Sequence, residues 1–321
     1  MKHIYVSSNE KNGGIFLFDQ TKTGELAERE KITLSFPLCT LYDSHSLWTV
    51  CDRCFGNRSG LIRIALNRNG SMKPSSLPQD TLGEEGCHLG LWQNRIWVAN
   101  YTDGSFFSSR GERKLHWGKG KDPVRQEGPH PHWVGPTPDG KYLAVVDLGL
   151  DRIFVYRADL SLRSCLSFPA GTGPRHLAFD PEGKYAFVSC ELNSHLEMLS
   201  FEDGEFSRLF SVSSVPPSFC GRNYPAAVRL RGGRVYLSNR GHDSIASWRY
   251  DEAGLTDFQW ASCGGAWPRD MQWAGDDLIV ANEKSNSVTV MRAGEDGSLR
   301  LLPQTYSVPR ALCVTVADGE N

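Results

Sequence analysis

Short runs of apolar residues, rich in Val, Ile, Tyr, Phe and Trp, recur along the whole chain. Turn sequences such as Pro138-Asp139-Gly140 and Gly232-Gly233 separate them. Runs of four or five such residues are typical of β-strands, and no convincing ten-residue helical period interrupts them. The pattern predicts an all-β protein with strands at Ile15–Phe18, Leu47–Val50, Arg95–Ala99, Tyr142–Val146, Ile153–Tyr156, Tyr185–Ser189, Val235–Ser238, Leu278–Ala281 and Ser287–Met291.

The strand pattern is repeated seven times. A Pro or Gly opens each copy, and successive copies lie 41 to 51 residues apart. A period of about 40–50 residues that carries three to four strands is typical of a β-propeller blade. We therefore predict seven four-stranded blades, with copies that begin at Pro37, Gly86, Pro131, Pro174, Pro225, Pro268 and Pro309.

The two ends of the chain each carry part of one blade. The copy at Pro309 has a single strand, whereas the N-terminal run Ile4–Ser7 looks like a second strand with no first. Pairing of residues near Ala311–Val316 with residues near Ile4–Ser7 would complete this blade and remove the open sheet edge. The expected architecture is thus one seven-bladed β-propeller domain over residues 1–321, closed by its N- and C-terminal strands.

Charge and composition limit the function. The 321-residue chain has 35 Lys and Arg against 37 Asp and Glu, a balance that argues against a nucleic-acid binder. No apolar stretch approaches the ~18 residues of a membrane span, and no signal peptide is evident. Nine irregularly spaced cysteines suggest reduced thiols, and the lone pair Cys51 and Cys54 lacks the second pair of a structural zinc site. We expect a cytoplasmic monomer with no metal or cofactor, bound to neither nucleic acid nor membrane.

Hairpin geometry predicts where the polar residues of the repeat lie. Reflection about the turn glycine of one blade pairs Arg175 with Glu191, because antiparallel partners are equidistant from the turn. The same operation pairs Ala226 with Arg240 and places His132 at the equivalent end of its own blade. These residues should gather at one mouth of the central channel, which is the default binding site of a ring-shaped fold.

At these positions the chain resembles the lactonase family of seven-bladed propellers, which includes propeller-type 6-phosphogluconolactonases and carboxy-cis,cis-muconate cyclases. The resemblance rests on Gly173–His176, Ser238–Ser244, Arg125-Gln126, His130–Trp133 and Trp267–Met271. It implies metal-independent hydrolysis of a sugar lactone, above all of 6-phospho-D-glucono-1,5-lactone to 6-phosphogluconate in the pentose phosphate pathway.

The resemblance also implies a set of site residues. The catalytic set is His132, Arg175, Glu191 and Arg240, and the substrate-binding set is His130, Arg125 and Arg269. The motif alone leaves open whether His130 or His132 is the family's histidine. In such a site His or Glu191 would deprotonate water, and Arg175 or Arg240 would stabilise the charge that develops on the carbonyl oxygen.

We expect the mouth to favour an anionic, phosphorylated lactone, because guanidinium groups bind phosphate or carboxylate bidentately. Four arginines map to the mouth or beside it and two glutamates oppose them, namely Arg175, Arg240, Arg269, Arg310, Glu191 and Glu283.

Other interpretations remain open at this stage. The Arg175–Glu191 pair can be a structural ion pair, and a propeller can bind a protein or a sugar at its mouth without catalysis. A lactonase or cyclase that acts on an unphosphorylated or unsaturated acid lactone is a further alternative.

Overall fold

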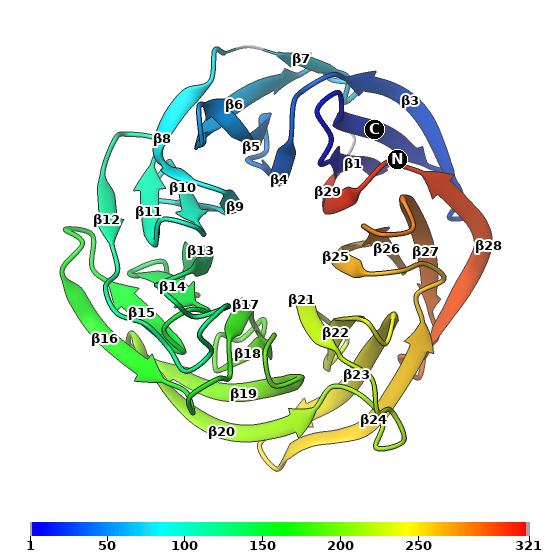
Figure 1. Ribbon diagram of the computed structural model, residues 1–321. Coiled ribbons are helices and arrows are strands. Elements are labelled where there is room, and N and C mark those ends of the chain that lie inside the picture. Colours follow the sequence, from blue (N-terminus) through cyan, green and yellow to red (C-terminus); the bar gives the residue numbers. More distant parts are fainter. Residues whose placement is uncertain (1, 75, 319–321) are drawn as a thin grey trace.

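In the computed structural model, which describes residues 2–74 and 76–318, seven β-sheets surround a central channel (Figure 1). Each sheet is a propeller blade, and its innermost strand lies next to the channel. The described residues form no helix, and therefore none that is long and apolar enough to cross a membrane. The prediction of an all-β, seven-bladed propeller is confirmed.

The first four blades, numbered in chain order, have the following strands. Blade 1 consists of β4 (Pro37–Tyr42), β5 (Ser46–Phe55), β6 (Arg58–Leu66), β7 (Met72–Pro74) and β8 (Gln79–Glu84). Blade 2 consists of β9 (Gly86–Trp92), β10 (Arg95–Asn100), β11 (Ser105–Ser108) and β12 (Arg113–Leu115). Blade 3 consists of β13 (Pro131–Pro136), β14 (Leu143–Asp147), β15 (Arg152–Tyr156) and β16 (Leu162–Ser167). Blade 4 consists of β17 (Pro174–Phe179), β18 (Tyr185–Cys190), β19 (His195–Glu202) and β20 (Glu205–Ser213).

The remaining three blades complete the ring. Blade 5 consists of β21 (Tyr224–Arg231), β22 (Arg234–Arg240), β23 (Ser244–Asp251) and β24 (Gly254–Ser262). Blade 6 consists of β25 (Pro268–Ala274), β26 (Asp277–Asn282), β27 (Ser287–Ala293) and β28 (Leu299–Ser307). Blade 7 consists of β29 (Ala311–Asp318), β1 (Lys2–Ser8), β2 (Gly14–Gln20) and β3 (Leu26–Ile32).

Blade 1 departs from the expected four strands. Two short strands share its outermost position, because β7 pairs with one end of β6 and β8 pairs with the other. Pro74 and Pro78 flank the break between them. Proline donates no backbone hydrogen bond, so it is confined to edges and ends of strands. This sheet therefore has five strands where the repeat predicted four.

Blade 7 joins the two ends of the chain. Strand β29 pairs antiparallel with β1, with Val316 opposite Ile4 and Ala311 opposite Ser8. The predicted closure is confirmed, and β1 gains a partner on the edge that faces away from β2.

The core lies between the blades. Seven apolar clusters of described residues occupy the seven interfaces between neighbouring sheets. A middle strand such as β18 is buried at every position, because another blade covers each of its faces. Strands of this kind read as short continuous apolar runs rather than as an alternating pattern, which is how the sequence revealed them.

A β-bulge interrupts the inner hairpin of every blade near the start of the inner strand. In blade 4, Pro174 pairs with Cys190 and His176 pairs with Ser189, so Arg175 has no opposite partner. A bulge bends the strand and re-aims the side chain of the extra residue. We call these extra residues the bulge positions; from blade 1 to blade 7 they are Leu38, Cys87, His132, Arg175, Ala226-Ala227, Arg269 and Leu312-Cys313.

We predict that ring closure is essential for stability. Truncation before Ala311 removes a strand whose Leu312, Cys313 and Val314 are buried, and each large apolar side chain lost from a core costs about 1.5–3 kcal/mol. A loss above about 4 kcal/mol is a large share of the ~5–15 kcal/mol that stabilises a typical domain. Calorimetry should show a strongly lowered or absent transition for the truncated chain.

The matched control for truncation is Asp318→Ala. It removes the exposed ion pair with Lys2 but keeps β29 in place, so it should cost less than about 1 kcal/mol. A truncated chain that melts at the temperature of the full chain would contradict the role of β29 in closing the ring.

Candidate active site

The bulge positions form a ring of side chains at the mouth of the channel where the inner strands begin. Blades 3, 4 and 6 contribute His132, Arg175 and Arg269 to this ring. Blade 5 contributes only small side chains at Ala226 and Ala227. Both of these alanines are buried.

Glu191 lies at the centre of a buried cluster of charges, which we call the Glu191 cluster: Glu191, Arg125, Arg175 and Arg240. The Oε2 atom of Glu191 lies 3.1 Å from Nε of Arg175 and 2.5 Å from Nη2 of Arg240. Its Oε1 atom accepts a hydrogen bond of 2.5 Å from Nη2 of Arg125. All but Arg125 are buried. One carboxylate thus fixes three guanidinium groups from two blades and a loop.

The fold brings this cluster together in two ways. Glu191 follows β18, and its backbone N–H donates to the carbonyl of Gly173 just before the inner strand. The bulge shifts the backbone partner of Glu191 from Arg175 to Gly173, yet the two side chains still meet. Arg240 ends β22 and is opposite Tyr224 rather than the expected Ala226, because the turn is centred between Gly232 and Gly233 and the bulge in blade 5 shifts the register by one more residue.

Burial and the three cations have opposite effects on the pKa of Glu191. Burial alone raises it, but Arg240, Arg175 and Arg125 outweigh burial and hold the pKa well below its usual range. Burial, together with Arg240 and Arg269, lowers the pKa of Arg175 to about 9. Glu191 is therefore a permanent anion and a weak base, and Arg175 remains a cation at neutral pH.

His132 is the buried imidazole of the ring. Its Nδ1 lies 3.8 Å from Sγ of Cys87, and its ring packs edge-on against His176. Burial and the charge of Arg175 lower the pKa of His132 well below its usual value, so the ring is neutral at pH 7 and can accept a proton. Burial raises the pKa of Cys87 to about 12, which excludes a reactive thiolate there.

His130 has different surroundings from His132. Its Nδ1 lies 2.8 Å from the carbonyl of Tyr101, and its ring stacks on Tyr101 at 4.3 Å between centroids. Its backbone N–H donates to Asp147. These contacts fix the loop that leads into β13, whereas His132 lies at the bulge position next to Arg175 in the ring.

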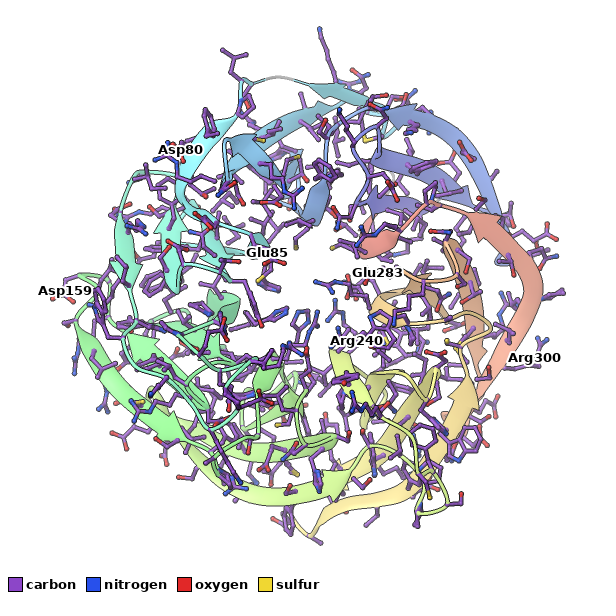
Figure 2. All side chains as sticks on the ribbon, viewed as in Figure 1. Asp80, Glu85, Asp159, Arg240, Glu283 and Arg300 are labelled. Atoms are coloured by element: carbon purple, nitrogen blue, oxygen red, sulfur yellow. The ribbon has the colours of Figure 1, made fainter. Side chains whose placement is uncertain are left out.

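Arg269 belongs to a second cluster, the Glu283 cluster, made of Arg269, Glu283 and Arg310. Nη2 of Arg310 donates to Oε1 of Glu283 at 3.0 Å, and Nη1 of Arg269 lies 3.6 Å from Oε2. The side chain of Arg310 is 46% exposed and that of Arg269 is 25% exposed. Figure 2 shows Glu283, Arg240 and Glu85 around the channel.

Three residues that support the site were missed from the sequence. Tyr101 occupies the repeat position of Glu191 and accepts a hydrogen bond of 3.4 Å from Arg125. Asp147 accepts the N–H of His130 and pairs with His116 at 2.5 Å. The repeat alignment could have indicated Tyr101, since it follows the second strand of its blade as Glu191 does. His116 lies in a loop outside the repeat, where no sequence signal applied.

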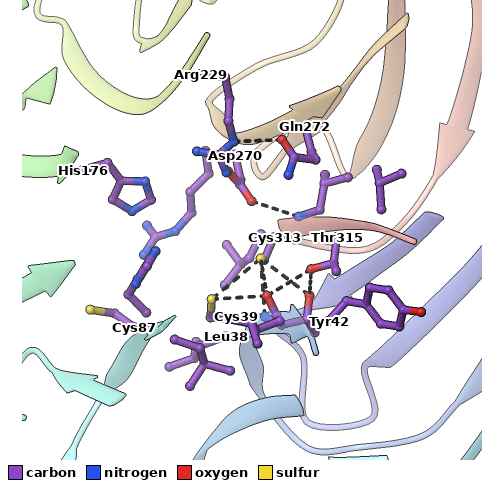
Figure 3. Close-up of a pocket in the computed structure, with 18 of the residues that line it drawn as sticks. Leu38, Cys39, Tyr42, Cys87, His176, Arg229, Asp270, Gln272, Cys313 and Thr315 are labelled. Atoms are coloured by element: carbon purple, nitrogen blue, oxygen red, sulfur yellow. Dashed lines mark hydrogen bonds and ion pairs between the residues drawn. The ribbon is translucent and has the colours of Figure 1, made fainter. Parts of the chain in front are cut away.

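A cavity of about 270 Å³ continues from the mouth into the channel (Figure 3). Arg175, Arg269 and the Arg229–Asp270 ion pair all line this cavity. Within the described residues, Nη1 of Arg175 and Nδ1 of His176 are buried without a hydrogen-bond partner. No three His, Cys, Asp or Glu side chains among those residues are grouped to hold a metal ion.

The fold and mouth define the class of the protein: a seven-bladed β-propeller with a polar small-molecule pocket at one end of its channel. The sequence profile described as "Lactonase, 7-bladed beta-propeller" matches residues 3–316. The chain therefore belongs to the lactonase family, and it is a lactone hydrolase by this membership. The resemblance seen in its motifs is confirmed, and the family favours an enzyme over a non-catalytic propeller.

Individual relatives agree with this assignment. The chain is 37% identical to 6-phosphogluconolactonase of Bacillus subtilis (strain 168) over 257 residues, which span 72% of this chain and 73% of the relative. It is 30% identical to an uncharacterized protein of Staphylococcus aureus (strain N315) over 98% of this chain and 99% of that one. A solved structure from Lactobacillus plantarum superposes with a TM-score of 0.90 at 28% identity, covering 99% of this chain and 100% of that chain.

We predict that Glu191→Gln, which keeps the shape of the side chain, is strongly destabilising. At pH 7 it leaves three guanidinium groups around an uncharged amide, and breaking a buried ion pair costs about 3–5 kcal/mol. Urea unfolding at pH 7 measures this loss.

The pH dependence gives an independent check on Glu191. Because its folded pKa lies below the unfolded value of about 4.3, its contribution is complete above that pH and is lost as the pH falls below it. The unfolding free energy of the wild type should therefore decrease more steeply below about pH 4.5 than that of the variant. Parallel pH curves for the two proteins would count against a strongly lowered pKa.

Proposed function

We propose that the protein hydrolyses 6-phospho-D-glucono-1,5-lactone to 6-phosphogluconate, a step of the pentose phosphate pathway, at the mouth lined by the bulge positions. The local charge carries this proposal. The Glu191 and Glu283 clusters hold five arginines against two glutamates, and the hollow that Arg310 lines adds Arg53 against Asp52, Glu84 and Glu85, which leaves an excess of one positive charge. A phosphate monoester carries about −1.5 to −2 at pH 7. A cytoplasmic monomer remains the expectation from composition.

In the proposed mechanism, neutral His132 is the general base. A water molecule attacks the lactone carbonyl carbon while His132 takes one of its protons. The carbonyl oxygen becomes an oxyanion, and the unpartnered Nη1 of buried Arg175 is a donor suited to it. Collapse of the tetrahedral intermediate breaks the bond between the carbonyl carbon and the ring oxygen, which leaves with the proton from His132.

Glu191 is a positioning residue in this scheme. Guanidinium groups of Arg125, Arg175 and Arg240 hold both of its carboxylate oxygens, so neither oxygen is free to take a proton from water. Glu191 holds Arg175, Arg240 and Arg125 in fixed directions, so that no reorganisation is needed as the oxyanion forms. The choice between His132 and Glu191 as base thus falls on His132.

We predict a strong preference for the phosphorylated lactone. A pH-stat assay, corrected for spontaneous hydrolysis, should give a kcat/KM about 10²-fold or more above that for glucono-1,5-lactone, because the added anion meets uncompensated arginines. Added salt should reduce the ratio by screening the partly exposed mouth. Equal kcat/KM for the two lactones would overturn the phosphate assignment and favour an unphosphorylated or unsaturated acid lactone.

We predict that the pH profile of kcat/KM lacks the inflexion near pH 6.5 that a histidine base with an ordinary pKa would produce. Because burial and Arg175 lower the pKa of His132, kcat/KM for glucono-1,5-lactone, which has no phosphate that titrates near pH 6, should stay constant as the pH falls through about 6.5 and should decrease only in more acidic solution. His132→Gln should reduce kcat by about 10²- to 10⁴-fold. The control His45→Gln, on an exposed turn of blade 1, should retain full activity. An inflexion near 6.5, or an active His132→Gln protein, would refute this role.

A further inference from the structure

We propose that Arg269 and Arg310 of the Glu283 cluster bind the phosphate group of the substrate, while the Glu191 cluster acts on the lactone ring. This inference rests on the proposed function and divides the mouth into two subsites. It assigns specificity to Arg310, a residue at the rim of the ring that takes no part in the proposed chemistry.

The two clusters are built in the same way on blades 4 and 6. In each, an arginine occupies the bulge position of the inner strand, and a glutamate follows the second strand. In each, the backbone N–H of that glutamate donates to the residue before the inner strand, Gly173 for Glu191 and Trp267 for Glu283. The repeat has therefore placed the same pair of charged groups twice at one mouth.

Burial separates the roles of the two clusters. Arg175 and Glu191 are buried, which suits a step in which water must be excluded and charge develops briefly. Arg269 and Arg310 are partly exposed, which suits a dianion that keeps part of its hydration. His132 lies beside Arg175 in the ring, on the other side from Arg269, so the base is at the Glu191 end.

The Glu283 cluster also has guanidinium N–H groups that remain available as hydrogen-bond donors to a ligand. The guanidinium of Arg269 donates no hydrogen bond to any residue that the structure describes, since its contact with Glu283 is an ion pair at 3.6 Å. Arg310 uses Nη2 for Glu283, while its backbone N–H donates to Asn286 and its carbonyl accepts from Asn9. The backbone of Arg310 is thus anchored on both sides of a side chain that is half exposed at the rim.

Blade 5 separates the two clusters. Its bulge position offers only Ala226 and Ala227, between Arg175 on blade 4 and Arg269 on blade 6. Arg175 and Arg269 line one cavity, so a single ligand can contact both. In the 1,5-lactone ring the phosphate is carried on a CH2 arm next to the ring oxygen, so it can contact charged groups other than those that meet the carbonyl.

The test compares Arg310→Gln with the wild type on 6-phospho-D-glucono-1,5-lactone and on glucono-1,5-lactone. Loss of a charge-assisted hydrogen bond should lower kcat/KM for the phosphorylated lactone by about 10- to 100-fold. Hydrolysis of the plain lactone should stay within about twofold of the wild type. Arg175→Gln should lower kcat/KM for both lactones, because both share the carbonyl.

The matched control is Arg300→Gln, which removes the same charge from the exposed outer strand of blade 6 (Figure 2). Arg300→Gln should leave kcat/KM unchanged for both lactones. An equal loss on both lactones for Arg310→Gln, or no loss on either, overturns the phosphate subsite. An equally large loss of kcat/KM in the Arg300→Gln control also overturns the phosphate subsite.

Inorganic phosphate separates failure of this inference from failure of the proposed function. It should inhibit hydrolysis of the plain lactone in the wild type at about 10-fold lower concentration than in Arg310→Gln. If the wild type does not prefer the phosphorylated lactone but this difference holds, the anion subsite stands and the proposed substrate is wrong. If phosphate inhibits both proteins alike, the subsite is wrong whatever the substrate.

Discussion

The pairing of β29 with β1 is the constraint on which the rest of the molecule depends. Without it, blade 7 would end at β1, and the clusters that join it to blades 1 and 6 would lose the residues of β29. Closure holds seven inner strands around one channel, and so it fixes the distance between residues on blades 3, 4 and 6. A catalytic arrangement that spans several blades requires a ring that cannot open.

Within that ring, charge balance organises the mouth. Glu191 is outnumbered by three arginines, and its ionised form holds guanidinium groups where burial alone would disfavour them. The neighbouring His132 experiences the same positive surroundings and stays neutral. One arrangement of charges thus places fixed cations beside a neutral imidazole, which is the combination that the proposed mechanism uses.

Much of the fold and of the candidate site could be predicted from the sequence, and the rest could not for physical reasons. Seven repeats predicted the blades, and hairpin symmetry brought Arg175 to Glu191. Symmetry misplaced the partner of Arg240 by two residues, because the turn is centred between Gly232 and Gly233 and the bulge adds one residue. Arg125 comes from a loop outside the repeat, so the family resemblance marked it as a candidate binding residue but did not predict its contact with Glu191. The proposed choice of His132 over Glu191 as base depends on the three arginines around Glu191, which are far apart in the sequence and meet only in the folded ring.

The bulges also bear on how such a mouth can change over time. A bulge residue has no opposite partner in the sheet, so its side chain can be exchanged without loss of a ladder pair. Cys87, Ala226 and Leu38 hold the same structural position as His132 and Arg175. The ring therefore offers positions at which new chemistry can be acquired one blade at a time, while the packing between blades that keeps the protein folded is left intact.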